Sequence, residues 1–571
     1  MSRSSRAARR TPPVSRALDP ATDRLRLRPW HVAAALAALH LVLALLIAAP
    51  TPDEGGDNAA YLALARSLLE NGSYRELWDP AARQHTQYPP VWPMVLAGAM
   101  ALGIGPWLGF KVIAALFSAA AVAFAYLWAR RVSTSGVALG TGLLLASGMG
   151  VVSHAGRELS DAPFWAFTML ALWAFARWAA EAERRPAAVP GLATGALLLA
   201  YLTRSAALPM LVAAAAWLAW HRRWRALGVV AAGVGPAALL WALRRRALGG
   251  DGYGAYVWYV DPYRPELGSA SAGELLGRIG RNLVDYAHDQ LPFLLTGYRI
   301  GAFASLLGTG VVVLAAAGWA LRLRNRRAGL AEWWLPLYAG LVLVWPAEWA
   351  GERFLLPALP VLLVHAGEGL GRIAAWAPRP RRVVRGIGAA AVGACLFFSL
   401  GGIVLEAGRV AGCRARFGPL EPFPCLRPGA ADFLGLARSS RGMLPAGSTV
   451  IARKPTLFWA ESGYPSRAFP YVGEPDSLLR TAREAGARYV VVDRFDNVAG
   501  IHLVPAIAQR PQAFCVMASV GESRATLLGI LPGAEAMPNV RERPRNERVE
   551  MNFDECPAEY WAVGAAPAWG P

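Results

Sequence analysis

Long apolar runs, separated by short polar segments, fill most of residues 30–407. The runs are roughly 16–25 residues long, which is the length of helix that crosses a ~30 Å hydrocarbon core. They predict eleven membrane-spanning helices, at about residues 30–50, 108–130, 136–153, 162–180, 188–203, 206–220, 226–247, 302–321, 333–349, 354–376 and 383–407. A further apolar stretch, 88–105, is short and carries prolines near its start, so we interpret it as a half-helix that lies in or dips into the outer leaflet.

The pattern changes after residue 407. Two segments rich in Val and Ile, 448–455 and 487–493, predict buried strands, and residues 474–487 between them predict a helix. Residues 513–531 predict a hairpin that turns near Gly521. We therefore expect a polytopic α-helical membrane domain (30–407), followed by a soluble α/β domain (408–535) and a loosely ordered C-terminal segment (536–571).

Composition supports a membrane protein and argues against nucleic-acid binding. Of the 571 residues, 55% are hydrophobic and 17% are charged, which is unusually apolar for a soluble protein. The net charge of +19 comes almost entirely from Arg, since the chain has lysine only at positions 111 and 454. Arg clusters between apolar runs, such as 221–225, 322–327 and 379–385, are typical of cytoplasmic loops.

These clusters also orient the chain in a cytoplasmic (inner) membrane. Residues 1–29 are basic and no cleavage site follows the first apolar run, so we interpret them as a cytoplasmic tail and not as a signal peptide. With this tail inside, the loops 51–90, 154–161, 248–301 and 350–353 and everything after residue 407 lie outside. The exception to the charge rule is the triplet Arg244–Arg246, which falls at the outer surface.

Cysteine positions agree with an outer C-terminal domain. Cys395 lies in an apolar run, whereas the other four follow the last run. An even number of cysteines in one soluble domain favours disulfides and an oxidising compartment. The preferred pairs are Cys413 with Cys425 and Cys515 with Cys556, and four unpaired thiols are the alternative.

Two outer loops concentrate acidic residues. In the first, Asp57 opens an amphipathic helix that Gly72 closes, and its carboxylate either caps that helix or points into a cavity. In the second, Arg157, Glu158 and Asp161 stand in a connection of about eight residues beside the hydrocarbon, where charges are costly and usually functional. An ordinary solvated loop is the alternative for the second.

The motifs around these acids resemble the GT-C superfamily of integral membrane glycosyltransferases, in particular the protein mannosyltransferase and aminoarabinose transferase type. They comprise an acidic residue opening a D-x-x-x-Y-x-x-x-A-x-x-L helix, the pair Pro89–Pro90, "RELSDAPF" (157–164), "YLTRSAALP" (201–209) and "GERFLLPALPVLL" (351–363). The soluble segment with "STVIARKPTLFW" and "GARYVVVD" is similar to the domain that many such proteins carry. The resemblance spans most of residues 30–535 and implies a GT-C-like fold.

The resemblance implies transfer of a sugar, with inversion, from a polyprenyl-phosphate carrier to an acceptor on the outer face. It makes Asp57 the catalytic base or organiser, with Asp53 second, and matches the family's other acid to Asp161, with Glu158 beside it. Gln87–Tyr88 stands where some relatives have an acidic–basic pair. A transporter or flippase of lipid-linked sugars is the rival, although no repeat or mid-span charge pattern supports one.

The chemistry asks for further groups around the acids. A departing lipid phosphate needs fixed positive charge, for which the candidates are Lys111, Arg157, Arg204, Arg353, Arg244 and Arg245. Snorkelling to the interface is the alternative for Lys111 and Arg204, and pairing with Glu352 or Glu348 for Arg353. Candidate sugar or acceptor contacts are Asp53, Tyr61, Tyr88, Tyr256 and Trp258, the last two in an aromatic loop that an interfacial belt explains equally.

Cofactors are less clearly indicated. His85 and His154 flank the acidic loops and could complete a divalent-metal site with Asp57 or Asp161, but no recognised ligand spacing supports one. The chain has no phosphate-binding glycine motif, which argues against a nucleotide sugar as the direct donor. The acceptor is left open between protein, lipid and polysaccharide.

Overall fold

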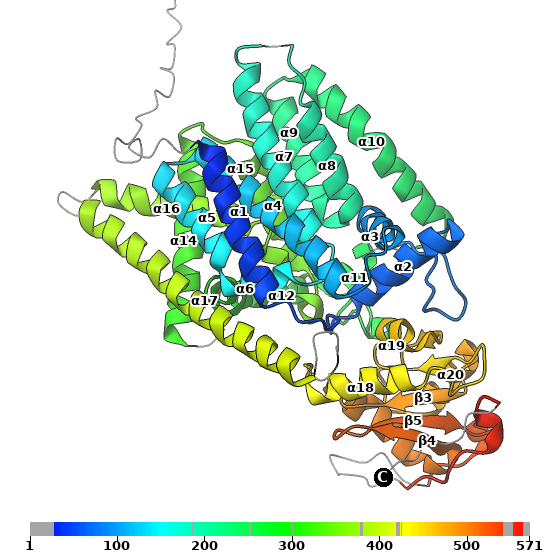
Figure 1. The fold of residues 1–571 in the computed structure, drawn as a ribbon. Coiled ribbons are helices and arrows are strands. Elements are labelled where there is room, and N and C mark those ends of the chain that lie inside the picture. Colours follow the sequence, from blue (N-terminus) through cyan, green and yellow to red (C-terminus); the bar gives the residue numbers. More distant parts are fainter. Residues whose placement is uncertain are drawn as a thin grey trace, which may run out of the picture.

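The computed structural model of the chain describes residues 28–185, 187–250, 253–299, 301–376, 381–417, 423, 425–540 and 552–563. The predicted tail, up to residue 27, lies outside them. A large helical part stands over a small sheet domain (Figure 1). Its main helices are α1 (Pro29–Leu46), α4 (Leu108–Val132), α5 (Ser135–Ser147), α6 (Met149–Ala155), α7 (Asp161–Ala182), α8 (Gly191–Thr203), α9 (Leu208–Trp220), α10 (Trp224–Ala247), α14 (Ala302–Arg324), α15 (Leu330–Val344), α16 (Leu359–Trp376) and α17 (Arg381–Phe417).

Each of the eleven predicted runs contains a helix, but the helices differ in length. Within the described residues, five are long and apolar enough to cross a membrane: α1, α4, α10, α14 and α17. The pair α5–α6 adds a sixth if its two parts form one span. Helices α8, α9 and α15 are apolar but have only 13, 13 and 15 residues. The number of spans therefore stays a prediction, whereas the helical membrane architecture is present.

The bend between α5 and α6 falls at Gly148, where α13 (Leu291–Thr296) comes close to the backbone. The two helices meet at 56°, and a side chain at Gly148 would lie 2.7 Å from the carbonyl oxygens of both Leu144 and Leu294. Only glycine lets α13 approach the backbone this closely. The bend directs α6 toward the outer loop that carries the second group of acids.

Two short helices lie at the end of the bundle that faces the sheet domain (Figure 1). Helix α2 (Asp57–Asn71) begins at the first acidic loop and ends at Gly72, whose left-handed φ of +56° stops the helix as predicted. Helix α3 (Val91–Ala101) has 11 residues, roughly 16 Å at 1.5 Å per residue, which is too short to cross a ~30 Å core. This length agrees with the expectation that residues 88–105 do not cross alone.

The soluble domain is built around a five-stranded sheet in the order β2–β1–β3–β5–β4. The strands are β1 (Val450–Ile451), β2 (Ser466–Arg467), β3 (Tyr489–Val492), β4 (Phe514–Val520) and β5 (Ala525–Ile530). The pairs β1–β2 and β1–β3 are parallel, with Val450 opposite Ser466 and Tyr489, whereas β3–β5 and β4–β5 are antiparallel. Helices α18 (Pro428–Ser439) and α19 (Pro455–Ser462) pack in one apolar cluster, and α20 (Pro475–Ala485) and α21 (Val504–Gln509) in another.

The predicted elements of this domain are present, but its boundaries differ. Helix α17 continues to Phe417, so the predicted boundary at residue 407 falls inside a helix. The segment predicted to be loosely ordered is partly packed: Glu555 bridges to Val516 on β4, and Tyr560 is fully buried. The structure bonds Cys413 to Cys425 and Cys515 to Cys556, so the segment after residue 551 is tied to β4.

The sheet domain and the helical part share one apolar cluster. Tyr61 of α2, Trp92 of α3 and Phe110 of α4 are buried in the same cluster as Phe433 of α18 and Phe458 of α19. A continuous core of this kind fixes the two parts relative to each other, because separating them would expose large aromatic surfaces to water.

Polar contacts join the domain to the first outer loop. Thr456 Oγ1 donates to the carbonyl of Gly56 at 2.8 Å, and Lys454 Nζ donates to the carbonyl of Gly55 at 3.1 Å. Gly56 has a φ of +95°, and a side chain there would lie 3.1 Å from Thr456 Oγ1. The soluble domain therefore holds the residues that immediately precede Asp57.

Candidate active site

Asp57 lies at the start of α2, but its carboxylate does not cap the helix. The N-cap position is Gly56, and no side chain caps the helix. Asp57 Oδ2 instead pairs with Arg353 Nη1 at 3.1 Å, and Asp57 Oδ1 accepts a hydrogen bond from the Tyr88 hydroxyl at 3.0 Å. Of the two alternatives for Asp57, capping is therefore not seen, and the carboxylate is held by partners from two distant segments.

These partners set the charge state of Asp57. Its burial raises the cost of ionisation, but the Arg353 guanidinium and the Tyr88 hydroxyl outweigh this cost and hold the pKa of Asp57 below its usual value. Burial also lowers the pKa of Arg353, whereas Asp161 and Asp57 raise it well above the ordinary range. The result is an ionised carboxylate, about one-third exposed, paired with a permanent cation.

A second ion pair forms at the start of α7. Asp161 Oδ2 lies 2.9 Å from Arg204 Nη1, and this nitrogen also donates to Ser160 Oγ at 3.2 Å. Ser160 Oγ in turn lies 2.7 Å from the hydroxyl of Tyr61 on α2. An acidic residue in the first turn is also favoured by the helix dipole.

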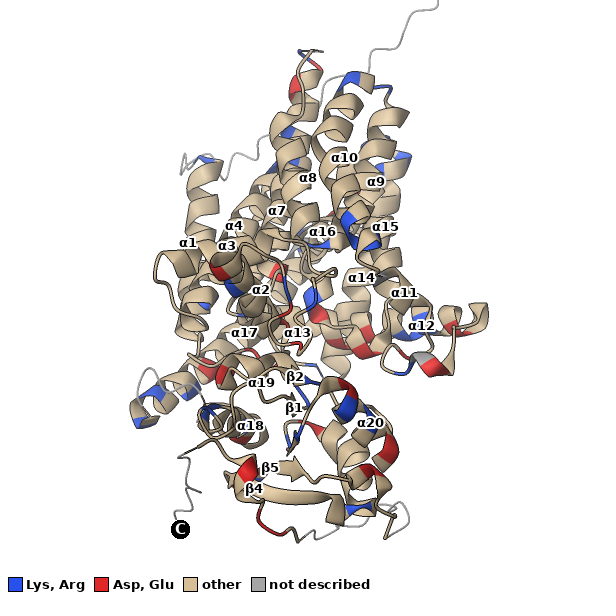
Figure 2. Ribbon diagram, turned by 90° about the vertical axis from the view of Figure 1, so that its right-hand side faces the viewer, with Lys and Arg blue, Asp and Glu red and all other residues tan. Residues whose placement is uncertain are grey.

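The two ion pairs belong to one site. Arg204 contributes to lowering the pKa of Asp57, and Asp161 contributes to raising the pKa of Arg353. The two ion pairs therefore interact electrostatically. The rings of Tyr61 and Tyr88 lie 4.8 Å apart and connect the pairs. Charged residues gather where the ends of the helices meet the sheet domain, whereas the helices between their ends are mostly uncharged (Figure 2). Six predicted residues thus converge, namely Asp57, Tyr61, Tyr88, Asp161, Arg204 and Arg353.

Glu158 and Lys111 form a separate, buried ion pair next to this site. Lys111 Nζ lies 3.1 Å from Glu158 Oε1 and donates to the carbonyl of Gly156 at 3.0 Å. Glu158 Oε2 accepts a hydrogen bond from the backbone of Asp53 at 3.2 Å. Glu158 is fully buried, and this burial raises its pKa despite the nearby Lys111. These contacts join the two acidic loops, and the catalytic role of Glu158 and the phosphate-binding role of Lys111 stay predictions.

Other predicted phosphate ligands also serve the loops. Arg157 Nε lies 3.5 Å from Asp53 Oδ2, which joins the two acidic loops. Arg244 Nη1 donates to the carbonyl of His85 at 2.6 Å, and its guanidinium lies over the rings of Tyr74 and Trp241. Arg245 is half-buried. None of these contacts brings the three arginines to the Asp57–Asp161 site.

The two candidate metal-ligating histidines are engaged elsewhere. His85 Nδ1 lies 2.8 Å from Glu76 Oε1 and its Nε2 accepts from the backbone of Tyr88, so it orients the residue that binds Asp57. His154 Nδ1 donates to the carbonyl of Gly150, and its Nε2 lies 3.5 Å from Glu352 Oε1. Among the residues that the structure describes, no three His, Cys, Asp or Glu side chains form a metal-binding group.

The two predicted aromatic contacts differ in position. Tyr256 lies near the site, because its hydroxyl accepts a hydrogen bond from Gln87 Nε2 at 3.4 Å and Gln87 precedes Tyr88. Trp258 is 57% exposed. Sequence reasoning missed Ser160, which bridges Tyr61 and Arg204. Its position between the predicted Glu158 and Asp161 was the available signal.

The fold of this chain is similar to that of known proteins. A family model described as dolichyl-phosphate-mannose-protein mannosyltransferase matches residues 87–244. The crystal structure of ArnT from Cupriavidus metallidurans in the apo state aligns with a TM-score of 0.51 and 15% identity over 90% of this chain and 99% of that one. ArnT bound to undecaprenyl phosphate aligns with a TM-score of 0.52 and 17% identity over 88% and 98%.

A weaker likeness is to the oligosaccharyltransferase of Archaeoglobus fulgidus, with a TM-score of 0.49 and 14% identity over 86% of this chain and 72% of that one. No curated protein matches the sequence. The likeness to ArnT covers both the helical part and the sheet domain. The predicted fold class, a GT-C-like helical membrane protein with a C-terminal α/β domain, is confirmed, and so is the resemblance to the GT-C superfamily.

Proposed function

We propose that this chain, which has the GT-C fold, is an inverting glycosyltransferase that moves a sugar from a polyprenyl-phosphate carrier to an acceptor at the outer face of the cytoplasmic membrane. One observation carries the proposal most directly. Asp57 is an ionised carboxylate held between Arg353 and Tyr88 at the outer end of the membrane helices. The family model is described as a mannosyltransferase using a dolichyl-phosphate donor, and a similar structure was solved with undecaprenyl phosphate.

In the reaction, the acceptor hydroxyl oxygen forms a bond to the anomeric carbon while the bond from that carbon to the phosphate oxygen breaks. The electron pair stays on the phosphate, which leaves with its lipid, and the hydroxyl proton passes to Asp57. A carboxylate within hydrogen-bond reach is suited to this step. Since attack comes from the face opposite the leaving group, the configuration at the anomeric carbon inverts.

The two arginines complement the leaving group. Arg353 and Arg204 are permanently charged and each presents several donors in a planar fork, which matches a phosphate. When the carrier phosphate takes donors from Arg353, Asp57 loses part of its stabilisation as an anion. Its pKa then rises toward the ordinary value, so the carboxylate becomes a stronger base only when the donor is bound. Asp161 keeps Arg204 in place and adds negative charge near the developing cation, as in glycoside hydrolysis.

The proposed topology follows the arginine clusters. The N-terminus and the clusters 221–225 and 322–327 are placed in the cytoplasm. The two disulfides in the region after residue 407 support an extracytoplasmic position for the sheet domain.

The test is turnover by the full chain, purified with native lipids, on a panel of radiolabelled polyprenyl-phosphate sugars. Asp57→Asn and Asp161→Asn are compared with Glu70→Gln, which changes an exposed acid on the same helix as Asp57. Loss of turnover in the first two variants, with normal melting and with Glu70→Gln active, supports the assignment. Tight carrier binding without turnover in the wild type would favour the transporter or flippase.

A further inference from the structure

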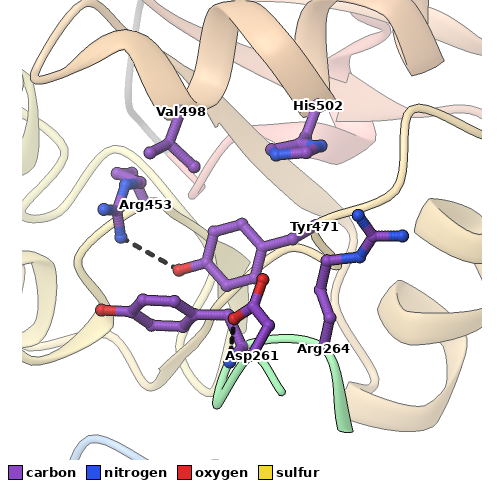
Figure 3. A pocket seen from close by; sticks show the side chains of 7 residues that line it. Asp261, Arg264, Arg453, Tyr471, Val498 and His502 are labelled. Carbon is purple, nitrogen blue, oxygen red and sulfur yellow. Dashed lines mark hydrogen bonds between the residues drawn. The ribbon is translucent and has the colours of Figure 1, made fainter. Parts of the chain in front are cut away.

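A cavity lies between the outer loop 259–264 and the sheet domain, away from the two ion pairs. Its volume is about 140 Å³. The outer loop contributes Asp261, Tyr263 and Arg264, and the sheet domain contributes Arg453, Tyr471, Val498 and His502. In Figure 3 the labelled side chains converge from above and below, with Tyr471 between Arg453 and Arg264. The cavity therefore exists only because the two parts of the chain meet.

The lining combines flat rings with fixed polar groups. Arg453 donates to the Tyr471 hydroxyl at 3.1 Å and pairs with Asp496 at 2.7 Å, which fixes both side chains. The backbone of Tyr263 donates to Asp261 Oδ1 at 2.8 Å, and this turn fixes the loop. Aromatic walls with a few convergent polar groups are the usual lining of small-molecule sites. At roughly half the lower end of the 300–1,000 Å³ of drug-sized pockets, the cavity accommodates about one ring.

A continuous row of aromatic rings runs from this cavity toward Asp57. Tyr471 lies 5.1 Å from Tyr263, Tyr263 lies 5.6 Å from Trp349, and Trp349 lies 5.0 Å from Tyr256. The Tyr256 hydroxyl then accepts from Gln87, the neighbour of Tyr88. We name these four rings the aromatic row. Each of its steps is close to the length of one pyranose unit in a glycan.

A membrane-interface belt does not account for the row. Such belts place Trp and Tyr at the level of the lipid headgroups, whereas Tyr471 belongs to the sheet domain, between β2 and α20. The cavity has Val498 as its only aliphatic lining residue among the described side chains, so it does not suit an acyl chain. Extended peptides usually add to a free sheet edge, and the cavity presents side chains instead.

We propose that the cavity and the aromatic row bind a saccharide acceptor, with one sugar ring in the cavity against Tyr263 and Tyr471 and the chain directed along the row to Asp57. This inference rests on the proposed glycosyltransferase function and names its acceptor as a glycan. Hydroxyl groups of the bound ring meet Asp261, Arg264, Arg453 and His502, and ring faces meet the tyrosines. The hydroxyl at the other end of the glycan is the one from which Asp57 takes the proton.

The test is saturation-transfer NMR on the full chain in detergent, with soluble tetrasaccharides of glucose, mannose, galactose and N-acetylglucosamine as probes and a Ser/Thr-rich peptide as the competing class. We expect at least one tetrasaccharide to bind. Tyr263→Ala and Tyr471→Ala should each weaken binding roughly tenfold or more, because each removes one wall. Tyr263→Phe keeps the ring and should retain binding. Tyr298→Ala is the matched control, since Tyr298 is 51% exposed and its ring contacts Phe398 of α17 instead of the row.

Donor turnover, measured on the same variants with water as acceptor, separates the two proposals. Wild-type turnover that survives Tyr263→Ala, together with lost saccharide binding, supports an acceptor subsite. Wild-type turnover with no binding of any tetrasaccharide, or with binding unaffected by Tyr263→Ala and Tyr471→Ala, would overturn the subsite and leave the glycosyltransferase intact. Transfer to the peptide that Tyr263→Ala leaves unchanged would also overturn it. Saccharide binding without turnover of any donor would instead contradict the proposed function.

Discussion

Removing the charge of Arg353 tests whether this residue keeps Asp57 ionised. In Arg353→Gln the burial of Asp57, the largest influence on its carboxyl group, is no longer offset by the Arg353 guanidinium, and only the weaker influences of Tyr88 and Arg204 remain. The pKa of Asp57 therefore rises, and the carboxyl is protonated at a higher pH than in the wild type. Because a protonated Asp57 cannot accept the acceptor's proton, the acid limb of kcat/KM should move to higher pH.

The geometry sets the size of this shift. Two unit charges 4 Å apart attract by about 4 kcal/mol at an effective dielectric constant near 20. The Arg353–Asp57 pair is close, at 3.1 Å, but the side chains are 27% and 35% exposed, so water screens much of this energy. We take about 1.4 kcal/mol as the part that remains, which corresponds to about one pKa unit.

The assay is donor turnover between about pH 3 and pH 7, a range that includes the acid limb of the wild type, with kcat/KM fitted at each pH. Arg353→Gln should show the raised acid limb together with a higher KM for the carrier, whereas Arg353→Lys keeps the charge and should shift the limb less. Arg245→Gln, at the same outer surface, serves as the control. Melting curves at each pH exclude unfolding. An acid limb in Arg353→Gln that coincides with the wild-type limb, with turnover still measurable, would refute the role of this pair.

Three further results are expected. Glu158→Ala should leave the buried Lys111 without its ion-pair partner and lower the free energy of unfolding by about 3–5 kcal/mol. This loss should appear as a lower melting temperature. The double variant Glu158→Ala with Lys111→Met should recover part of the melting temperature. Cys515→Ser with Cys556→Ser should cost about 2–5 kcal/mol of stability, and reduction of the wild type should cost at least as much, since it also opens the Cys413–Cys425 bond. Thr456→Val should lower kcat with little change in carrier affinity, whereas an unchanged kcat would mean that the contact of Thr456 with Gly56 does not position Asp57.

Local patterns in the sequence were sufficient for much of the fold. Strand β3, helix α20 and the hairpin of β4 and β5 depend on neighbouring residues, and all three lie where they were predicted. The apolar runs likewise locate the helices. Their lengths are harder to predict, because α8, α9 and α15 are shorter than a full span and pack against longer neighbours.

The sequence singled out six residues that lie together in the structure, but it did not predict which of them form pairs. Asp57 and Arg353 are separated by 296 positions, so no periodicity reveals that they meet. Glu158 and Asp161 are only three residues apart, yet Glu158 is fully buried against Lys111 and Asp161 reaches Arg204. Which acid faces the site depends on where α7 begins, and that is decided by tertiary packing.

The apolar cluster shared by α2, α3, α18 and α19 determines how this chain can be recombined. A chimaera that exchanged only the residues after 417 would bring a foreign surface against Tyr61 and Trp92 and would remove the donors to Gly55 and Gly56. The smallest unit that can be exchanged between such proteins is therefore not one continuous segment. It comprises the sheet domain together with the loop that starts at residue 51. The sheet domain's part of the proposed acceptor cavity and the alignment of Asp57 are accordingly exchanged together.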